Sequence, residues 1–373
     1  MTPPVPPYSS LPPHSSAFLS AGLAETLRSK SAEAEVNREL HPDQMALIYK
    51  QQWFRMLLPE VHSLSSPKKP PLSLSQLVRL EEGISWADGS VGWTVTLCSG
   101  AGWFAGFFPP AAFPDIFSDK QLCLAGSGAP SGEAHIVPSG YRISGRWDYA
   151  SGALHATAFT ANCVIMENGQ RLLTDDGSPL VRSFLFRKEE VSVIKNWNTI
   201  GLIATGSYAF EVRNAMIPSD RCFDIEPSQA KGSHPIYHYP FLQLAEATLA
   251  ANLSGMGIHF LDCATDFFYR RIRSGRVPAN AAGEMDEALA AAQNTIQTKR
   301  TEFYKTLDHS WESQTDFDAV SRCSRGLVTA VLRMVDKLYP YGGLGAARPD
   351  TELNRVWRDL HTASQHNLLV FGR

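Results

Sequence analysis

The hydrophobic periodicity of the chain changes twice, and this order of patterns constrains the fold more than any other feature. From about Ala17 to Ser118 apolar residues follow helical spacing, with breaks at prolines. From about Gln121 to Ile225 the pattern changes to short alternating runs divided by Gly, Asp and Pro. From Phe241 onward helical spacing returns. We therefore expect an α+β fold with helices first, a β block next and a helical bundle last.

The same patterns predict domains and individual elements. Residues 1–16 are rich in Pro and Ser and predict a disordered tail. We expect an N-terminal helical domain over 17–118, a β domain over 119–228 and a helical bundle over 229–373. Strands are predicted at 141–149, 156–166, 182–187, 191–198 and 207–216, and helices at 284–306 and 316–338. Small residues beside the apolar stripe that starts at Ala245 predict a close helix–helix contact: Ala247, Ala250, Ala251, Ser254 and Gly255.

Charge and cysteine content exclude several classes of protein. The net charge is −3 and the chain has no basic stripe, so we expect no nucleic-acid partner. Residues 91–113 carry no charge, but their glycines and Pro109-Pro110 break the pattern, which predicts a buried helix and an apolar loop and no membrane span. The six cysteines are scattered singly and no secretory signal is evident, so we expect reduced thiols and a cytoplasmic protein.

The stretch from Tyr141 to Gly152 is a predicted strand that runs into a small turn. Its Ser151 can form hydrogen bonds, and its Gly152 has no side chain, so a flat ring could approach the backbone there. Trp147 would supply an aromatic wall. Taken alone, the stretch is more typical of an ordinary edge strand with a tight turn.

The segment from Gly342 to His366 is the second candidate for chemistry. Its glycines could present backbone amides to a phosphate, although capping a helix is their commoner use. Arg358 and Asp359 follow on a predicted helix, where an ion pair at the bundle surface is the plain alternative. His366 lies seven residues past Asp359, two turns along the same predicted helix, and alone would suggest a hydrogen-bonded core histidine.

Five blocks in this order resemble the acyl-CoA dehydrogenase fold, and within it the two-component (group D) flavin-dependent monooxygenases. The blocks span 80–93, 126–132, 140–152, 197–207 and 342–366. The resemblance implies a middle antiparallel β-barrel-like domain, a C-terminal four-helix bundle that forms a homotetramer, and a flavin, FAD or FMN, between the two. A neighbouring subunit would complete the flavin site.

The resemblance also implies roles for individual residues. Ser151 and His366 would be catalytic. Residues near the flavin would be Ser127, Gly128, Trp147, Ser151, Gly152, Trp197, Thr205, Ser207, Gly342, Gly343, Gly345 and Arg358. Trp93, Trp103, Phe104 and Phe107 would line the substrate pocket. His361 competes with His366 as the important imidazole.

His366 falls close to the place of the family's catalytic glutamate, and residues 360–368 contain no carboxylate. A hydroxylase of a small aromatic or related organic substrate, using reduced flavin and O2, therefore fits better than a desaturase. No G-x-G-x-x-G follows a strand, so the reducing equivalents would come from a separate flavin reductase. Two alternatives stay open: a flavin dehydrogenase with its base elsewhere, for example Glu246, and a non-catalytic protein that keeps the fold.

A metal site is not predicted. His234 and His238 have the spacing of ligands on a helix, but Pro235 and Pro240 argue against a helix there, and no nearby carboxylate or cysteine completes a site.

Overall fold

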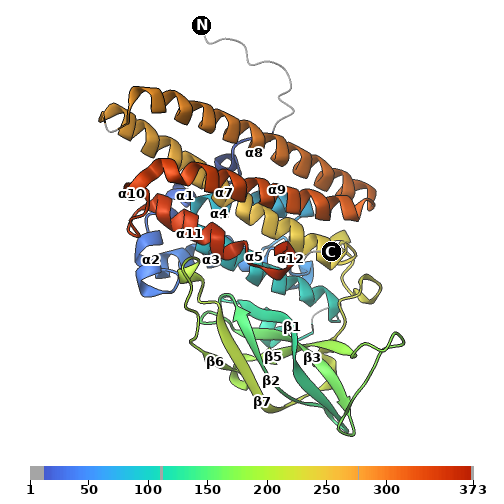
Figure 1. Cartoon of the computed structure of the whole chain (residues 1–373). Helices are drawn as coiled ribbons and strands as arrows, with labels where there is room; N and C mark the ends of the chain where they lie inside the picture. Colours follow the sequence, from blue (N-terminus) through green and yellow to red (C-terminus); the bar gives the residue numbers. More distant parts are fainter. Residues whose placement is uncertain (1–11, 110–111, 276, 371–373) are drawn as a thin grey trace.

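The computed structural model describes residues 12–109, 112–275 and 277–370. Helices gather on one side of the molecule and a β-sheet on the other, with α5 and α12 close to the boundary between them (Figure 1). Along the chain the order is helices, strands, helices, as the periodicity predicts.

The first group of helices covers residues 15–117. Its members are η1 (Ser15–Phe18), α1 (Ala21–Arg28), α2 (Ser31–Asn37), α3 (Pro42–Gln51), η2 (Trp53–Arg55), η3 (Glu60–His62), α4 (Leu74–Ala87), α5 (Gly89–Trp103), η4 (Phe104–Phe107) and α6 (Pro114–Phe117). Side chains fix where the central two begin: Ser73 and Gln76 form a capping box at α4, and the Asp88 carboxylate accepts the Val91 N–H at the start of α5. Helix α5 is buried along nearly its whole length.

The strands form one sheet. They are β1 (Leu124–Val137), β2 (Gly140–Ala150), β3 (Ala158–Glu167), β4 (Gln170–Arg171), β5 (Val181–Arg187), β6 (Ser192–Ile194), β7 (Tyr208–Ile217) and β8 (Cys222–Phe223). The order across the sheet is β6-β7-β2-β1-β3-β5-β8, with β4 paired to β3. Short 3-10 turns lie between and after the strands: η5 (Lys188–Glu190), η6 (Ile203–Thr205), η7 (Ser219–Arg221), η8 (Pro227–Gln229) and η9 (Pro235–Tyr237).

The last group of helices forms the bundle. It contains α7 (Phe241–Arg273), α8 (Ala279–Ser313), α9 (Phe317–Leu338), η10 (Tyr339–Gly342), α10 (Gly343–Ala346), α11 (Glu352–Ala363) and α12 (Asn367–Val370). Helix α7 packs against α9, α11 and also α4 of the first group. A Cβ on Gly255 of α7 would clash with the Glu82 carbonyl oxygen of α4. The predicted close contact at the small residues of α7 is thus confirmed, and it joins the N-terminal helices to the bundle.

Four expectations need correction. Residues 124–137 form the long strand β1, which the pattern did not predict, and its Gly126–Gly132 block is an irregular stretch of strand where a loop was expected. Strand β1 pairs with β3 in parallel, so the sheet is not purely antiparallel. Among the described residues no pairing joins β6 to β8, so the predicted barrel-like closure is not shown. Ser15 and Ser16 of the predicted tail lie in η1, whereas 1–11 lie outside the described residues.

Candidate active site

Ser151 follows the last residue of β2 and is buried, with 4% of its surface exposed. Its hydroxyl accepts a hydrogen bond from the indole N–H of Trp93 at 3.1 Å and shares another with the Ser207 hydroxyl at 2.8 Å. Ser207 in turn bonds to Thr205 Oγ1 at 2.7 Å. Three residues singled out in the sequence, Ser151, Thr205 and Ser207, therefore form one buried chain of hydroxyls that ends on an aromatic residue of α5.

Trp93 also contacts His366, so Ser151 and His366 share one neighbour. The Trp93 and His366 rings lie edge to face, with centroids 5.9 Å apart. His366 does not lie on a continuous helix with Asp359, as the spacing predicted, because α11 ends at Ala363 and a turn follows. Its Nδ1 instead accepts the Leu368 N–H at 3.3 Å, at the start of α12.

Burial lowers the pKa of His366, and no other cause contributes. The imidazole is therefore neutral near pH 7, with one nitrogen that accepts a proton and one that donates a hydrogen bond. Because Nδ1 accepts the Leu368 N–H, Nε2 carries the proton of the neutral ring, and this N–H is suited to donate a hydrogen bond to the oxygen of a bound phenol.

His361, the competing imidazole, lies elsewhere. Its Nε2 is 2.9 Å from Asp336 of α9, and its ring packs on Trp357 with centroids 4.3 Å apart. These contacts fasten α11 to α9. His366 is the histidine of this pair that lies beside the Trp93–Ser151 contact.

The loop that carries Thr205 and Ser207 is held by α11. The Asp359 carboxylate accepts the Leu202 N–H at 2.5 Å, and the Leu202 carbonyl accepts the Thr205 hydroxyl at 2.8 Å. The Thr205 carbonyl then accepts the Gly152 N–H at 3.0 Å. Asp359 is thus linked through this loop to the Ser151-Gly152 turn. The sequence offered only the Arg358-Asp359 pair as a signal, which we interpreted as a surface feature, whereas Asp359 is 5% exposed.

Arg358 was predicted to bind the cofactor, and the structure commits its guanidinium to protein groups. It donates to Asn354 Oδ1 and to the Ile200 carbonyl, both at 2.7 Å, and it forms an ion pair with Glu35 at 2.7 Å. The planar donor group thereby joins α11, the 197–207 loop and α2. Its predicted contact with the cofactor stays a prediction.

The two tryptophans predicted to flank the ring differ in position. Trp147 is fully buried, stacks on Phe210 with centroids 5.2 Å apart, and donates to the Asn162 carbonyl at 2.9 Å. Its placement beside a flavin was therefore wrong, because the ring fills the core of the sheet. Trp197 is half-buried, donates to the Leu202 carbonyl at 2.9 Å, and lies 6.2 Å from the ring of Tyr149.

Tyr149 belongs to an open surface that fits a flat ring. It is 74% exposed and adopts φ +69°, a conformation that costs energy for a residue other than glycine. In the antiparallel pairing Glu133 faces Ser144, so the exposed Gly128 of β1 lies toward the same end of the strand pair as Tyr149. A Cβ on Gly128 would meet no atom within 4 Å. Ser127 precedes Gly128 on β1 and is half-buried.

Gly152 completes the turn for a steric reason. Its φ is +74°, and a Cβ there would lie 2.7 Å from Cys98 Sγ. The exposed Tyr149 and the uncovered Gly128 thus lie toward one end of the strand pair, whereas Gly152 is packed against Cys98 of α5.

Within one chain, the glycine turn at Gly342, Gly343 and Gly345 does not lie beside the cluster of Trp93, Ser151 and His366. Gly343 has φ +56° and packs near Arg271 of α7. The turn precedes α11, whereas His366 follows it, and twelve helical residues span about 18 Å. Its predicted place near a flavin phosphate stays a prediction.

The four residues that were predicted to line the substrate pocket lie in two separate places. Trp93 lies at Ser151, but Trp103 is fully buried and donates to the Ile236 carbonyl at 2.8 Å. Phe104 and Phe107 pack around it in an aromatic cluster. These three residues therefore form an aromatic cluster apart from Trp93, and Phe107 also lines the larger of two hollows. The two hollows have volumes of about 570 and 370 Å³, and neither is lined by Trp93, Ser151 or His366.

Glu246, the alternative base, does not fit that role. Its side chain is fully buried in α7 and forms an ion pair with Arg325 at 2.5 Å. The carboxylate is thus committed to a cation inside the bundle and does not face the Trp93–Ser151 cluster.

Comparisons with known proteins identify the family of the chain. The family model "Acyl-CoA dehydrogenase, C-terminal domain" matches residues 243–371. A "Pigment production hydroxylase" of Rhodococcus sp. is 30% identical over 321 residues, which cover 80% of this chain and 79% of that one. The "Flavin-dependent monooxygenase, oxygenase subunit HsaA" of Rhodococcus jostii is 26% identical over 365 residues, 92% of each chain.

One solved structure shows the shared fold. XiaF from Streptomyces sp., in complex with FADH2 and glycerol, superposes with a TM-score of 0.78 at 21% identity, covering 95% of this chain and 93% of that chain. The fold, the buried cluster and these relatives define a flavin-dependent oxidoreductase. The chain belongs to the flavin-dependent monooxygenases that have the acyl-CoA dehydrogenase fold, as the sequence resemblance predicted.

None of the described helices is long and apolar enough to cross a bilayer.

Proposed function

We propose that this chain is the oxygenase component of a two-component system that hydroxylates a small aromatic substrate with reduced flavin and O2. A separate reductase would supply the reduced flavin, as the words "oxygenase subunit" in the name of one relative suggest. The observation that carries the proposal is the position of Trp93, which contacts Ser151 and His366 from segments 215 residues apart in the sequence.

Reduced flavin, when bound, activates dioxygen so that one oxygen atom is transferred to the substrate. Tyr149 and Trp197 would contact the ring, with the uncovered Gly128 allowing its close approach. Ser151 would hold the edge of the ring through its backbone, because its hydroxyl is already engaged by Trp93 and Ser207. The buried hydroxyl chain keeps this turn rigid and excludes water behind it.

His366 would act on the substrate. Its lowered pKa keeps the imidazole neutral, and because Nδ1 accepts the Leu368 N–H, Nε2 carries the proton and would donate a hydrogen bond to the oxygen of a phenol-like substrate. Trp93 would orient the imidazole by its edge-to-face contact.

Replacement of His366 tests this assignment. The purified chain is supplied with reductase, FAD or FMN, O2 and a panel of phenols and indoles, and hydroxylated product is measured against hydrogen peroxide. His366→Ala should bind flavin as the wild type does and lose at least about tenfold in coupled hydroxylation, the usual scale for a lost acid–base group. His361→Ala is the matched control and should keep its coupling. Unchanged coupling in His366→Ala would remove His366 from the mechanism.

We also propose a homotetramer that binds FAD. Leu344, beside the glycine turn, is 91% exposed and would be covered by a second subunit packed against this turn. In such an assembly, the glycine turn of one subunit would lie near the flavin site of another subunit and help to complete it. Light scattering should give four times the 41.0 kDa chain mass, and reduced FAD should bind more tightly than reduced FMN. A monomeric mass would contradict the homotetramer, and tighter binding of FMN would contradict the choice of FAD.

A further inference from the structure

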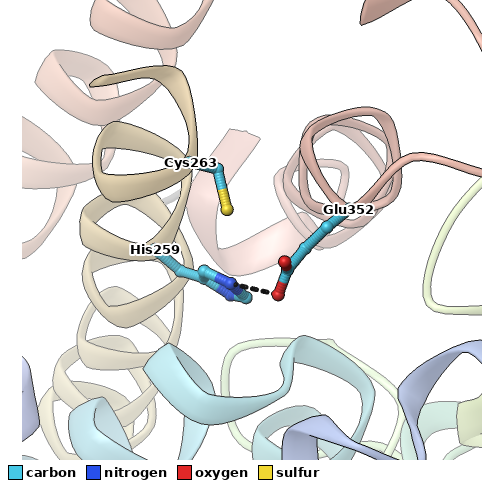
Figure 2. Close-up of side chains that lie close together, drawn as sticks. All are labelled: His259, Cys263 and Glu352. Carbon is cyan, nitrogen blue, oxygen red and sulfur yellow. Dashed lines mark hydrogen bonds and ion pairs between the residues drawn. The ribbon is translucent and has the colours of Figure 1, made fainter. Parts of the chain in front are cut away.

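Three side chains with metal-binding atoms meet between α7 and α11, away from the Ser151 cluster. His259 and Cys263 lie one turn apart on α7, and Glu352 is the first residue of α11 (Figure 2). His259 Nε2 is 2.9 Å from Glu352 Oε1, and the candidate ligand atoms of all three residues lie within 4.8 Å of one another.

The chemistry of the set suits a zinc-like ion. Imidazole nitrogen, cysteine sulfur and carboxylate oxygen are its usual protein ligands, and residues four apart on a helix share one face. Ligand atoms on one tetrahedral zinc lie about 3.3–3.7 Å apart, given bonds of 2.0–2.3 Å. The present separations therefore require small side-chain rotations and no movement of either helix.

The three side chains differ in their exposure to solvent, and a positive charge lies near them. His259 is 5% exposed, whereas Cys263 and Glu352 are half-buried, so the site is reachable from Glu352. Arg28 lies 3.6 Å from the Glu352 carboxylate and opposes a cation. However, its guanidinium is anchored over the Trp86 ring at 4.4 Å and donates to the Trp86 carbonyl.

Protonation sets the conditions for binding. Burial raises the pKa of Cys263 to about 12, with smaller contributions from Glu352 and Asp262, which raise it, and from Arg28 and Arg355, which lower it. The hydrogen bond from His259 is the main cause that lowers the pKa of Glu352, to about 2. A metal that binds Cys263 as a thiolate releases the thiol proton.

We propose that His259, Cys263 and Glu352 form a site for one divalent, thiophilic metal ion such as Zn²⁺, with water as the fourth ligand. The ion would join α7 to the start of α11, the helix whose Asp359 holds the 197–207 loop. Its effect is on stability, since the flavin reaction needs no metal.

Cobalt(II) is the probe, because a thiolate ligand gives it a near-ultraviolet charge-transfer band. The full chain, before flavin is added, is titrated with Co²⁺ at pH 8, followed by Zn²⁺. We expect one Co²⁺ per chain, a thiolate band that Zn²⁺ abolishes, and a higher melting temperature with Zn²⁺. Cys263→Ser should lose the band, and His259→Gln should weaken binding at least tenfold, whereas Cys323→Ser, a half-buried cysteine of α9, should behave as wild type.

Absence of the band, or its persistence in Cys263→Ser, would overturn the proposal and leave the His259–Glu352 contact as an ion pair only. Circular dichroism verifies that each variant folds. If Cys263→Ser fails to fold, Glu352→Gln serves in its place, and unchanged Co²⁺ affinity there would overturn the proposal equally.

Discussion

Glu81 of α4 is a carboxyl group buried where a charge is costly. One of its oxygens accepts the Ser99 hydroxyl at 3.3 Å, and the other has no partner among the described residues. Burial raises the pKa of Glu81 from 4.5 to about 8, and the hydrogen bonds lower it by less. Glu81 is therefore protonated in the folded protein near pH 7.

This pKa makes stability depend on pH in a stated direction. Below about pH 4.5 the group is protonated in both states. Between about 4.5 and 8 only the unfolded chain releases the proton, so stability falls as pH rises, by up to about 1.4 kcal/mol per pH unit. Glu81→Gln should remove this loss. Urea unfolding gives the free energy of unfolding of both proteins at pH 5 and pH 8. The variant should become more stable relative to the wild type at pH 8 than at pH 5. The same difference in stability at both pH values would refute the raised pKa of Glu81.

At the scale of elements, the contact between α11 and the 197–207 loop positions the active site. Gly201 packs directly against the Arg358 backbone, and Asp359 is the group that receives the Leu202 N–H. Burial raises the pKa of Asp359 to about 7, so its charge changes near neutral pH, although either form can accept this bond.

Asp359 is therefore expected to be a positioning residue. Asp359→Ala should leave the buried Leu202 N–H unpaired, cost about 1–3 kcal/mol and lower coupling, whereas Asp359→Asn keeps an acceptor and should restore coupling. Rescue by the Asn variant separates this role from the loss of a negative charge: because either protonation state of Asp359 accepts the bond, the pH profile of coupling near pH 7 should be the same in wild type and in the Asn variant. Equal coupling in the Ala and Asn variants would contradict it.

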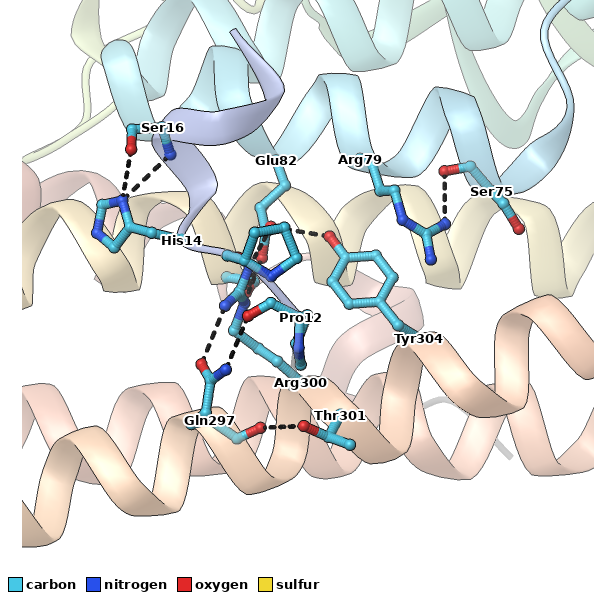
Figure 3. A network of polar contacts seen from close by, with 12 residues as sticks. Pro12, His14, Ser16, Ser75, Arg79, Glu82, Gln297, Arg300, Thr301 and Tyr304 are labelled. Atoms are coloured by element: carbon cyan, nitrogen blue, oxygen red, sulfur yellow. Dashed lines mark hydrogen bonds and ion pairs between the residues drawn. The ribbon is translucent and has the colours of Figure 1, made fainter. Parts of the chain in front are cut away.

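At the scale of the whole molecule, a buried ion pair joins the two helical groups. Glu82 of α4 accepts from Arg300 of α8 at 2.7 and 2.9 Å and from the Tyr304 hydroxyl at 2.8 Å (Figure 3). Both charged side chains are at most 1% exposed. Gln297, beside them, donates to the Pro12 carbonyl at 2.7 Å and so fastens the N-terminal segment to α8.

Arg300→Met should cost about 3–5 kcal/mol, because it leaves the Glu82 carboxylate buried without its cation. Arg348→Met is the control. Its ion pair with Asp350 is largely exposed, so the free energy of unfolding of this variant should stay close to that of the wild type. Thermal and urea unfolding measure both, and equal losses in the two variants would contradict the argument.

Periodicity predicted the order of elements, because burial on one face imposes a repeat on any helix or strand. It missed β1, whose glycines and serines at 126–132 have turn composition and become strand only through partners in β2 and β3. Ser151 and His366 were found through motif resemblance. Tertiary packing gives Ser151 and His366 their shared contact with Trp93. It also buries Trp147 fully and Trp197 only in part. Spacing along the chain does not encode such packing.

The close packing of α4 on α7 and α8 has a consequence for how the protein is made. While the chain emerges from the ribosome, α4 is synthesised more than 150 residues before α7, so its apolar face and Glu82 must wait for their partners. Fragments that stop after the sheet would expose that face and should aggregate or recruit chaperones.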